Sequence, residues 1–375
     1  MIAIVITAYN RAEPLATLLN NLLSIKTDGD NIPLVISIDN NGTPEVNAVA
    51  EQFQWPFGKK EVIIHKEKKG LVKHFIWTGD QTERYDNVIF LEDDLFVSPE
   101  MYHYTKEMIE FYKDDDTVAA ASLYNPILIE ANGTRFYQIE DGFDVYFFQQ
   151  PYWGHVWIRN KWIHFKEYLK TYQVNPDIIP SYIASWEKSF KKMYVQFLVE
   201  TGRTVVTPRL SLVTNNGVAG LHSDSAMYQY QSPLILKRRL YRFPRPSESI
   251  AKYDAYFELD QDVFKIFNSE TLKYDFEVDV NGIRKHYNKQ YVLTTRKSKN
   301  PIVSFTSLMK PTELGCLLNN IGIGLVLTES KDVVFDKSYE RERRYKDISK
   351  NYYVGVYASI RIAKDLFKHL FKLRR

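Results

Sequence analysis

The sequence of 375 residues is poor in cysteine and contains no long apolar segment. Its one cysteine, Cys316, cannot form an internal disulfide and has no cysteine partner for a zinc site, which fits a reducing compartment. The main candidate for a membrane span, residues 314–327, is too short to cross a bilayer and contains Asn319 and Asn320. The first residues lack the basic leader of a signal peptide. These absences predict a soluble cytoplasmic protein.

Motifs of several common enzyme classes are also missing. No Gly-rich loop of the dinucleotide-binding or Walker type follows the first apolar run, which argues against dehydrogenases and ATPases. No Gly-x-Ser-x-Gly motif is present, which argues against a serine hydrolase on an α/β sheet. The composition itself is ordinary, because 45% apolar and 25% charged residues exclude a wholly disordered chain.

Short apolar runs alternate with helical patterns through the first part of the chain. The runs that we predict to be strands are residues 2–7, 34–39, 62–65, 88–91 and 117–122. The predicted helices begin at Pro14 or cover residues 71–82, 99–112 and 183–201. This alternation indicates an α/β domain with a mainly parallel sheet, in which ligands bind beyond the carboxyl ends of the strands.

Three consecutive acids, Glu92, Asp93 and Asp94, follow the predicted strand 88–91. Carboxylates beside a buried strand are costly unless water or a cation neutralises them. At a strand end they can hold a hard divalent cation through oxygen and leave coordination sites for a diphosphate. The alternative is a solvated turn, which we expect for the acids at residues 114–116, between a helix and a strand.

Residues 7–11 (TAYNR) and Asp39 fall at the ends of the first two predicted strands. The helix that follows residue 11 offers N–H groups to a phosphate, and Arg11 adds a guanidinium that can bind phosphate in bidentate fashion. Asp39 can accept a hydrogen bond from a nucleobase or a ribose. Alternatively, it caps the turn at residues 40–42.

In their order along the chain, these segments resemble the GT-A glycosyltransferases. The matching segments are IVITAYNR (residues 4–11), ISID (36–39), GLVKHFIW (70–77) and VIFLEDDL (88–95). The His-x-x-Trp and Glu-Asp-Asp elements look most like the N-acetylglucosaminyltransferase I group and its bacterial family-2-like relatives. The resemblance covers roughly residues 1–230. It implies a Rossmann-like, mainly parallel sheet that binds a nucleotide-diphospho-sugar.

The resemblance implies a donor site at the carboxyl edge of the sheet. The residues that it assigns to donor binding are Thr7, Ala8, Tyr9, Arg11, Asp39, His74, Glu92, Asp93, Trp153 and Gly154. In this assignment Arg11 lies near the diphosphate, and Asp39 contacts uracil. Asp94 holds Mn²⁺ or Mg²⁺, and His222 completes the metal shell or touches the diphosphate. A structural role for His222 is the alternative.

The resemblance extends to a segment that carries the catalytic base, SWEKS at residues 185–189. Glu187 matches the first acid of the family's Trp-Asp-Asp pattern, but Lys188 stands where the second acid is expected. This departure leaves the base open between Glu187 and two other acids, Asp141 and Asp144.

Together these assignments predict a metal-dependent, inverting glycosyltransferase. It would move a sugar from a nucleotide sugar, in the first instance a UDP-sugar, to a glycan or lipid-linked glycan in polysaccharide biosynthesis. Two other functions stay open. One is a non-catalytic glycan-binding or assembly protein on the same fold. The other is a sugar-phosphate nucleotidyltransferase, although the Gly-rich amino-terminal loop of those enzymes is absent here.

We expect three parts along the chain. Residues 1–245 form the GT-A domain, with a nucleotide-binding half (1–125) and an acceptor or catalytic half (126–245). Residues 246–335 form a smaller mixed module whose role the sequence does not indicate. Residues 336–375 form a basic amphipathic helical tail.

Charge is distributed unevenly. The chain has a net charge of +3, but residues 337–375 contain twelve Lys or Arg against four Asp or Glu. Within residues 351–375, apolar residues recur at helical spacing opposite basic ones, a pattern typical of helices that lie on anionic membranes. We therefore expect peripheral attachment to the inner face of the cell membrane, with docking on the body or an oligomer contact as alternatives. The acidic body and the lack of a recognised module argue against nucleic acid.

Overall fold

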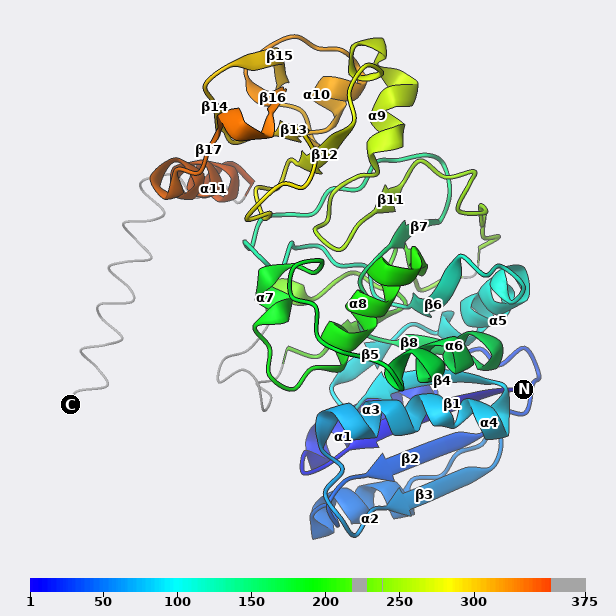
Figure 1. Cartoon of the computed structure of the whole chain (residues 1–375). Helices are drawn as coiled ribbons and strands as arrows, with labels where there is room; N and C mark the ends of the chain where they lie inside the picture. The colour runs from blue at the N-terminus through cyan, green and yellow to red at the C-terminus, as the bar shows by residue number, and fades with distance from the viewer. Residues whose placement is uncertain (218–227, 238, 352–375) are drawn as a thin grey trace, which may run out of the picture. The chain divides into compact units, whose positions relative to one another are not determined.

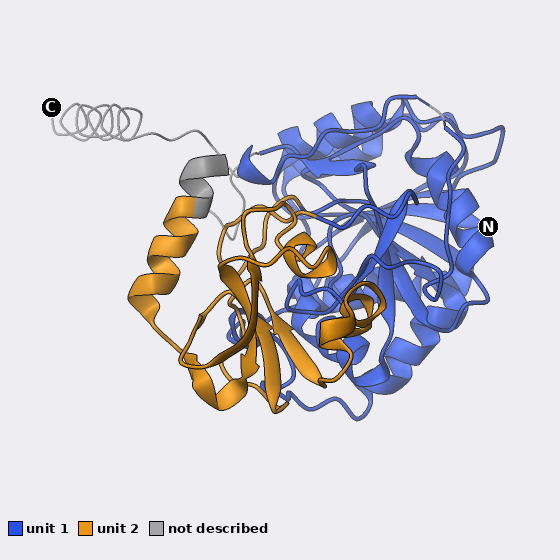
Figure 2. Ribbon diagram, turned by 90° about the horizontal axis from the view of Figure 1, so that it is seen from above, with its two compact units in different colours: residues 1–126, 138–260 blue, residues 127–137, 261–375 orange. Residues whose placement is uncertain are grey.

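The computed structural model describes residues 1–217, 228–237 and 239–351. The chain forms two compact units, shown in Figure 2: unit 1 comprises residues 1–126 and 138–260, and unit 2 comprises residues 127–137 and 261–375. Unit 1 extends beyond the expected boundary at residue 245. The reason is that strand β11 (Lys252–Tyr253) pairs with β7 (Val145–Phe148) and so joins the sheet of unit 1.

Unit 1 is built on a nine-stranded sheet in the order β11-β7-β9-β6-β8-β4-β1-β2-β3 (Figure 1). Its other strands are β1 (Ile2–Ala8), β2 (Leu34–Ile38), β3 (Lys60–Ile64), β4 (Asn87–Glu92), β6 (Val118–Ser122), β8 (His155–Ile158) and β9 (Thr204–Pro208). Five of the eight neighbouring pairs are parallel, which confirms the predicted mainly parallel α/β sheet. A two-stranded ribbon of β5 (Leu95–Val97) and β10 (Val213–Asn215) stands beside it.

Helices connect the strands of unit 1. They are α1 (Ala12–Leu22), α2 (Pro44–Gln52), α3 (Gly70–Asp80), α4 (Thr82–Tyr85), α5 (Met101–Tyr112), α6 (Arg159–Leu169), α7 (Ser181–Ala184) and α8 (Phe190–Thr201), with a 3-10 turn at Tyr228–Tyr230. Aromatic side chains from α3, α6 and α8 form one core with Ala3 and Val5 of β1. Because side chains alternate along a strand, Ile4 and Ile6 are buried on the other face of the sheet.

The predicted single helix over residues 183–201 is wrong. The structure ends α7 at Ala184 and begins α8 at Phe190, with an exposed, non-helical segment between them. Helix α8 begins at Phe190 for a local reason. The Ser189 hydroxyl accepts a hydrogen bond from the Lys192 N–H at 3.3 Å and thereby caps the helix. The break matters for function because it contains Glu187.

Unit 2 contains a four-stranded sheet in the order β12-β13-β16-β15 and a short β14-β17 ribbon. The strands are β12 (Phe276–Asp279), β13 (Tyr291–Thr294), β14 (Lys297–Ser298), β15 (Pro301–Thr306), β16 (Gly324–Glu329) and β17 (Val333–Val334). The helices are α9 (Gln261–Phe267), α10 (Leu314–Leu317) and α11 (Lys337–Asn351), with 3-10 turns at Ser269–Thr271 and Ser330–Asp332. The start of α11 belongs to this unit, and the expected membrane helix over residues 351–375 lies almost wholly outside the described residues.

Candidate functional site

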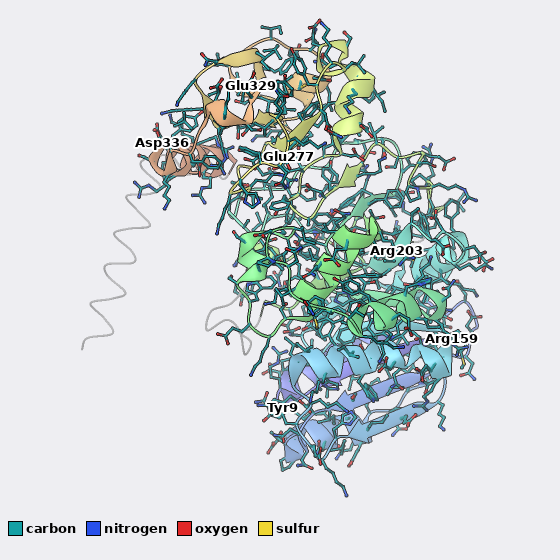
Figure 3. All side chains as sticks on the ribbon, in the orientation of Figure 1. Tyr9, Arg159, Arg203, Glu277, Glu329 and Asp336 are labelled. Carbon is teal, nitrogen blue, oxygen red and sulfur yellow. The ribbon has the colours of Figure 1, made fainter. Side chains whose placement is uncertain are left out.

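Three neighbouring parallel strands bring the polar residues together at one edge of unit 1. Thr7 in β1 is level with Ser37 in β2 and with Glu92 in β4. Asp39 directly follows β2, and Tyr9 follows β1. Figure 3 shows Tyr9 on one side of unit 1 and Arg159, which pairs with Asp86 before β4, on the other. The structure therefore brings Thr7, Asp39 and Glu92 together at the carboxyl edge of the sheet.

Arg11 is held by the acidic motif at this edge. Its guanidinium forms an ion pair with the Asp94 carboxylate at 2.9 Å and a second ion pair with Asp93. Burial by itself lowers the pKa of Arg11, but the two carboxylates outweigh burial and raise that pKa. Arg11 stands directly before α1, so its backbone also marks the start of that helix. The start of α1, Arg11 and the acids at the end of β4 thus lie in contact with one another.

The acidic motif carries more negative charge than Arg11 can balance. Burial raises the pKa of Asp93 to about 6, because the attraction of Arg11 offsets only part of the cost and Asp94 adds repulsion. Burial likewise raises the pKa of Glu92, with further increases from Asp94 and Asp93. Three carboxylates face a single guanidinium. When all three are ionised, the excess of two negative charges matches one divalent cation.

The donor atoms at this edge fit a hard divalent cation only in part. Carboxylate oxygens are the ligands that Mg²⁺ and Mn²⁺ prefer. Within the described residues, however, no group of three or more His, Cys, Asp or Glu side chains is placed to hold a metal ion. The Asp94 side chain is about one-fifth exposed, and the Asp93 side chain is buried. His222, the second candidate ligand, lies outside the described residues.

Asp39 joins the end of β2 to the start of α3. Its two carboxylate oxygens accept hydrogen bonds from the N–H groups of Lys69, at 2.7 Å, and Gly70, at 2.9 Å. Burial alone would raise the pKa of Asp39, but these backbone donors and nearby His74 lower it. Asp39 is thus kept ionised and fixed in position. The carboxylate still has a lone pair for a further donor.

A buried serine links two histidines behind Asp39. The Ser37 hydroxyl lies 2.7 Å from Nε2 of His74 and 2.9 Å from Nε2 of His65. Because a hydroxyl has one proton, it donates to one ring and accepts from the other. Burial lowers the pKa of His74 to about 4, so this histidine is neutral near pH 7. Sequence patterns missed Ser37 and His65, although both occur at the carboxyl ends of strands.

A glycine-containing turn forms a wall next to the acids. Strand β8 runs antiparallel to β4 with His155 opposite Phe90, so Trp153 and Gly154 lie beside the end of β4. Gly154 has a φ of +67°, and a Cβ at this position would lie 2.8 Å from Val213 and 2.9 Å from Leu123. The Trp153 ring packs edge-on against Tyr124, with centroids 4.8 Å apart. The predicted wall residues are therefore close to the acidic motif.

The ribbon of β5 and β10 reaches the same motif from the other side. Asn215 pairs with Leu95, and the Asn216 N–H donates to the Asp94 carbonyl at 2.8 Å. This contact fixes the backbone that carries the Asp94 carboxylate. Sequence patterns did not predict this hydrogen bond of Asn216, because an antiparallel contact between residues so far apart has no local pattern.

The three candidate bases have different surroundings. Asp141 accepts hydrogen bonds from Arg209 and from the Ser249 hydroxyl, both at 2.6 Å, and its side chain is buried. Asp144 forms an ion pair with Arg239 and accepts from the Arg242 N–H at 2.7 Å. Glu187 is exposed in the break between α7 and α8. Of the three, Glu187 is the carboxylate that solvent and a substrate can reach.

Comparison with curated proteins finds no match to this sequence. Within the described residues, no helix is both long and apolar enough to cross a membrane.

Several solved structures show a partial likeness. TarS from S. aureus (residues 1–349) is 11% identical with a TM-score of 0.38, over 56% of this chain and 59% of that one. GalNAc-T7 with UDP, GalNAc and Mn²⁺ is 11% identical with a TM-score of 0.42, over 57% and 43%. The mannosyltransferase PcManGT from Pyrobaculum calidifontis, in complex with GDP-Man and Mn²⁺, is 12% identical with a TM-score of 0.36, over 55% and 54%. This chain thus spans little more than half of these structures, or less.

A family model decides the classification. The model described as glycosyl transferase family 2 matches residues 3–194, which is just over half of the chain. The matched range contains β1, β2, β4 and the acidic motif at their carboxyl edge. The specific N-acetylglucosaminyltransferase I group is not confirmed by this match. The chain has the α/β, GT-A type of fold and belongs to glycosyl transferase family 2.

Proposed function

We propose that the carboxyl edge of unit 1 binds a nucleotide-sugar donor, and that the enzyme transfers the sugar with inversion to a glycan or lipid-linked glycan. The observation that carries this proposal is the group formed by Arg11, Asp93 and Asp94, directly before α1. A diphosphate placed there would meet a guanidinium and the N–H groups at the start of a helix. UDP is the first donor nucleotide to test.

Each end of the donor has candidate contacts. Asp39, fixed by α3, can accept a hydrogen bond from the imide N–H of uracil, and the buried Ser37–His74 pair keeps that region rigid. Thr7, Ala8 and Tyr9 provide the backbone of the first strand end. At the sugar end, Trp153 and Gly154 form the wall described above. Glu92 and Asp93 would face the ribose and the sugar.

Asp94 is the proposed ligand of Mn²⁺ or Mg²⁺, and His222 is the second candidate. Such an ion supplies charge neutralisation for the departing diphosphate. Arg11 assists by holding Asp93 and Asp94 in place and by contacting the phosphate oxygens as negative charge develops. The remaining coordination positions would be filled by the donor and water.

Glu187 is the proposed base. It would take the proton from the acceptor hydroxyl as that oxygen attacks the anomeric carbon on the face opposite the diphosphate, so that an α-linked donor gives a β-linked product. The ion pairs of Asp141 and Asp144 favour Glu187 over both. The acceptor would be a glycan of polysaccharide biosynthesis, carried on a lipid at the cytoplasmic face of the membrane, with the tail as a further anchor.

Thermal unfolding of the purified chain with UDP, GDP, CDP or dTDP, each with and without Mn²⁺, tests the donor site. A ligand at about 100 times its dissociation constant stabilises the fold by roughly 2.7 kcal/mol. We expect one nucleotide to raise the melting temperature in a metal-dependent way, and Asp94→Asn to remove that rise. Asp116→Asn, at an exposed acid of unit 1, is the matched control.

Other outcomes separate the alternatives. If no nucleotide stabilises the protein but a glycan does without metal, the chain is a non-catalytic glycan-binding protein. Turnover of a sugar 1-phosphate with a nucleoside triphosphate would identify a nucleotidyltransferase. Either result would contradict the proposed transfer.

A further inference from the structure

One face of helix α11 carries a row of cations. Lys337, Arg341 and Arg344 occupy positions i, i+4 and i+7 of α11, so their side chains lie on the same side of the helix. Lys337 and Arg341 are exposed, and Arg344 is half-buried. At 1.5 Å per residue the row is about 10 Å long. We call these three residues the cationic row.

The cationic row has no acidic partner among the side chains that the structure describes. Over residues 1–217, 228–237 and 239–346, no carboxylate forms an ion pair with any of its three side chains. The nearby acids are engaged elsewhere, since Glu340 pairs with Arg296 and Glu342 pairs with Lys346 at 2.6 Å. Unbalanced like charges at this spacing repel each other, so they weaken the helix unless an anion lies against them.

Contacts at the start of α11 and at Glu340, which lies beside the row at i+3 from Lys337 and i−4 from Arg344, fix the helix to unit 2. Asp336, labelled in Figure 3, caps the helix by accepting the N–H groups of Ser338 at 3.0 Å and Tyr339 at 3.1 Å. Glu340 binds Arg296, which is buried and also pairs with Asp279 at 2.9 Å. A helix held by these contacts cannot simply rotate its cations toward the body of the unit.

A hollow of about 600 Å³ lies against the same face. Its lining residues are Lys337, Ser338, Glu340, Arg341 and Arg344. A guanidinium binds phosphate oxygens through two parallel hydrogen bonds, and an ammonium binds them as a point charge. The hollow therefore combines room for a phosphate-sized group with three cations, and the one carboxylate in its lining, that of Glu340, is paired with Arg296.

We propose that the cationic row binds the phosphate groups of anionic phospholipids and thereby seats unit 2 on a membrane. A straight row suits an array of headgroups better than a single soluble anion, which would need the three cations to converge on one point. Charge complementarity extends along the chain, because residues 337–375 contain twelve basic residues against four acidic ones. Each Lys or Arg near an anionic surface contributes about 1 kcal/mol.

This surface deepens the proposed function, since a lipid-linked acceptor would lie at the same membrane. The proposed membrane contact depends on the proposed function only for its role in the cell, since binding to lipid does not require sugar transfer. The test below uses neither donor nor acceptor, so a failure of the membrane surface and a failure of the transferase reaction are distinguishable.

The test is sedimentation of the full chain with vesicles of phosphatidylglycerol and phosphatidylcholine, against vesicles of phosphatidylcholine alone. We compare the natural chain with K337Q/R341Q/R344Q. The matched control is K273Q/K331Q/K346Q, which removes the same charge from three exposed lysines of unit 2. These lysines already pair with Glu270, Glu329 and Glu342.

We expect the variant of the cationic row to lose about 100-fold in partitioning to anionic vesicles, the equivalent of three surface cations. The control should lose less than about 10-fold, because its charges are already paired. Equal losses in the two variants would overturn the proposal, as would a natural chain that does not bind anionic vesicles. Displacement from vesicles by low concentrations of inorganic diphosphate would assign the hollow to a soluble anion instead. Loss of a dimer in the row variant would assign it to a second copy.

Discussion

Gly154 is the position where the wall of the proposed donor site depends most directly on one residue. Its φ of +67° lies in the left-handed region, which costs an ordinary residue roughly 1–2 kcal/mol. In Gly154→Ala, the new Cβ would also lie 2.8 Å from Val213 and 2.9 Å from Leu123. Carbon atoms are in optimal contact at about 3.5–4.0 Å, so neighbouring atoms must move.

The cost of the close contacts with Val213 and Leu123 can be separated from the backbone cost by comparison with a second glycine of unit 1. Gly202, which ends α8, has a φ of +66° and no atom within 4 Å of the position of a Cβ. Gly202→Ala therefore carries the backbone cost alone. Overpacking of a well-filled site costs typically 1–3 kcal/mol. We expect Gly154→Ala to lower the free energy of unfolding by about 2–5 kcal/mol and Gly202→Ala by about 1–2 kcal/mol.

Urea denaturation followed by tryptophan fluorescence measures this difference. All six tryptophans of the chain lie in unit 1, so the signal reports the unit that contains both glycines. A second readout is the affinity for the nucleotide that stabilises the protein, which Gly154→Ala should weaken and Gly202→Ala should not. Equal losses of stability in the two variants would refute the argument from close contact with Val213 and Leu123.

Three further predictions follow from particular side chains. Because the pKa of His74 is lowered to about 4, this group is neutral in the folded chain while the unfolded chain gains a proton below about pH 6.5. The free energy of unfolding of unit 1 should therefore be highest above that pH and fall by about 3 kcal/mol as the pH drops to about 4. His74→Gln should remove this pH-dependent fall, whereas His164→Gln, at an exposed histidine, should leave it unchanged. Arg296→Met would leave Asp279 and Glu340 without their cation. Amide hydrogen exchange in β12 and β13 should therefore show that unit 2 loses about 3–5 kcal/mol of stability. Lys273→Met, at an exposed lysine, should cost almost none. Glu187→Gln should reduce turnover by about 100-fold or more with unchanged donor affinity, whereas the exposed Glu83→Gln should leave turnover intact; a reduction below about 10-fold would move the base away from Glu187.

The elements with strong local patterns were predicted well. The apolar run of β1, the leucine stripe of α1 and the strand before the acidic motif each have one dominant periodicity. Because the carboxyl ends of parallel strands meet at one edge, the order of the predicted strands also placed Thr7, Asp39 and Glu92 together. The helical pattern over residues 183–201 failed because the serine cap at Ser189 outweighs a continuous apolar spacing.

Contacts between distant residues were not predictable in the same way. Strand β8 inserts antiparallel between β4 and β6, and β11 adds an edge strand to unit 1 from beyond the expected boundary. Both pairings depend on register across the sheet, which no local window of sequence contains. The same holds for the hydrogen bond from Asn216 to Asp94, which fixes the acidic motif from the β10 side.

The sequence by itself determined the α/β class, the acidic motif and the edge at which the motif lies, because these follow from periodicity and from the geometry of parallel strands. Only the tertiary structure decided which charges are already paired. It engages Asp141 and Asp144 with arginines, places Arg11 between Asp93 and Asp94, and leaves the cationic row of α11 without an ion-pair partner among the side chains that the structure describes. Pairing depends on distances of a few ångströms between side chains far apart in the chain, and those distances exist only after the core has packed.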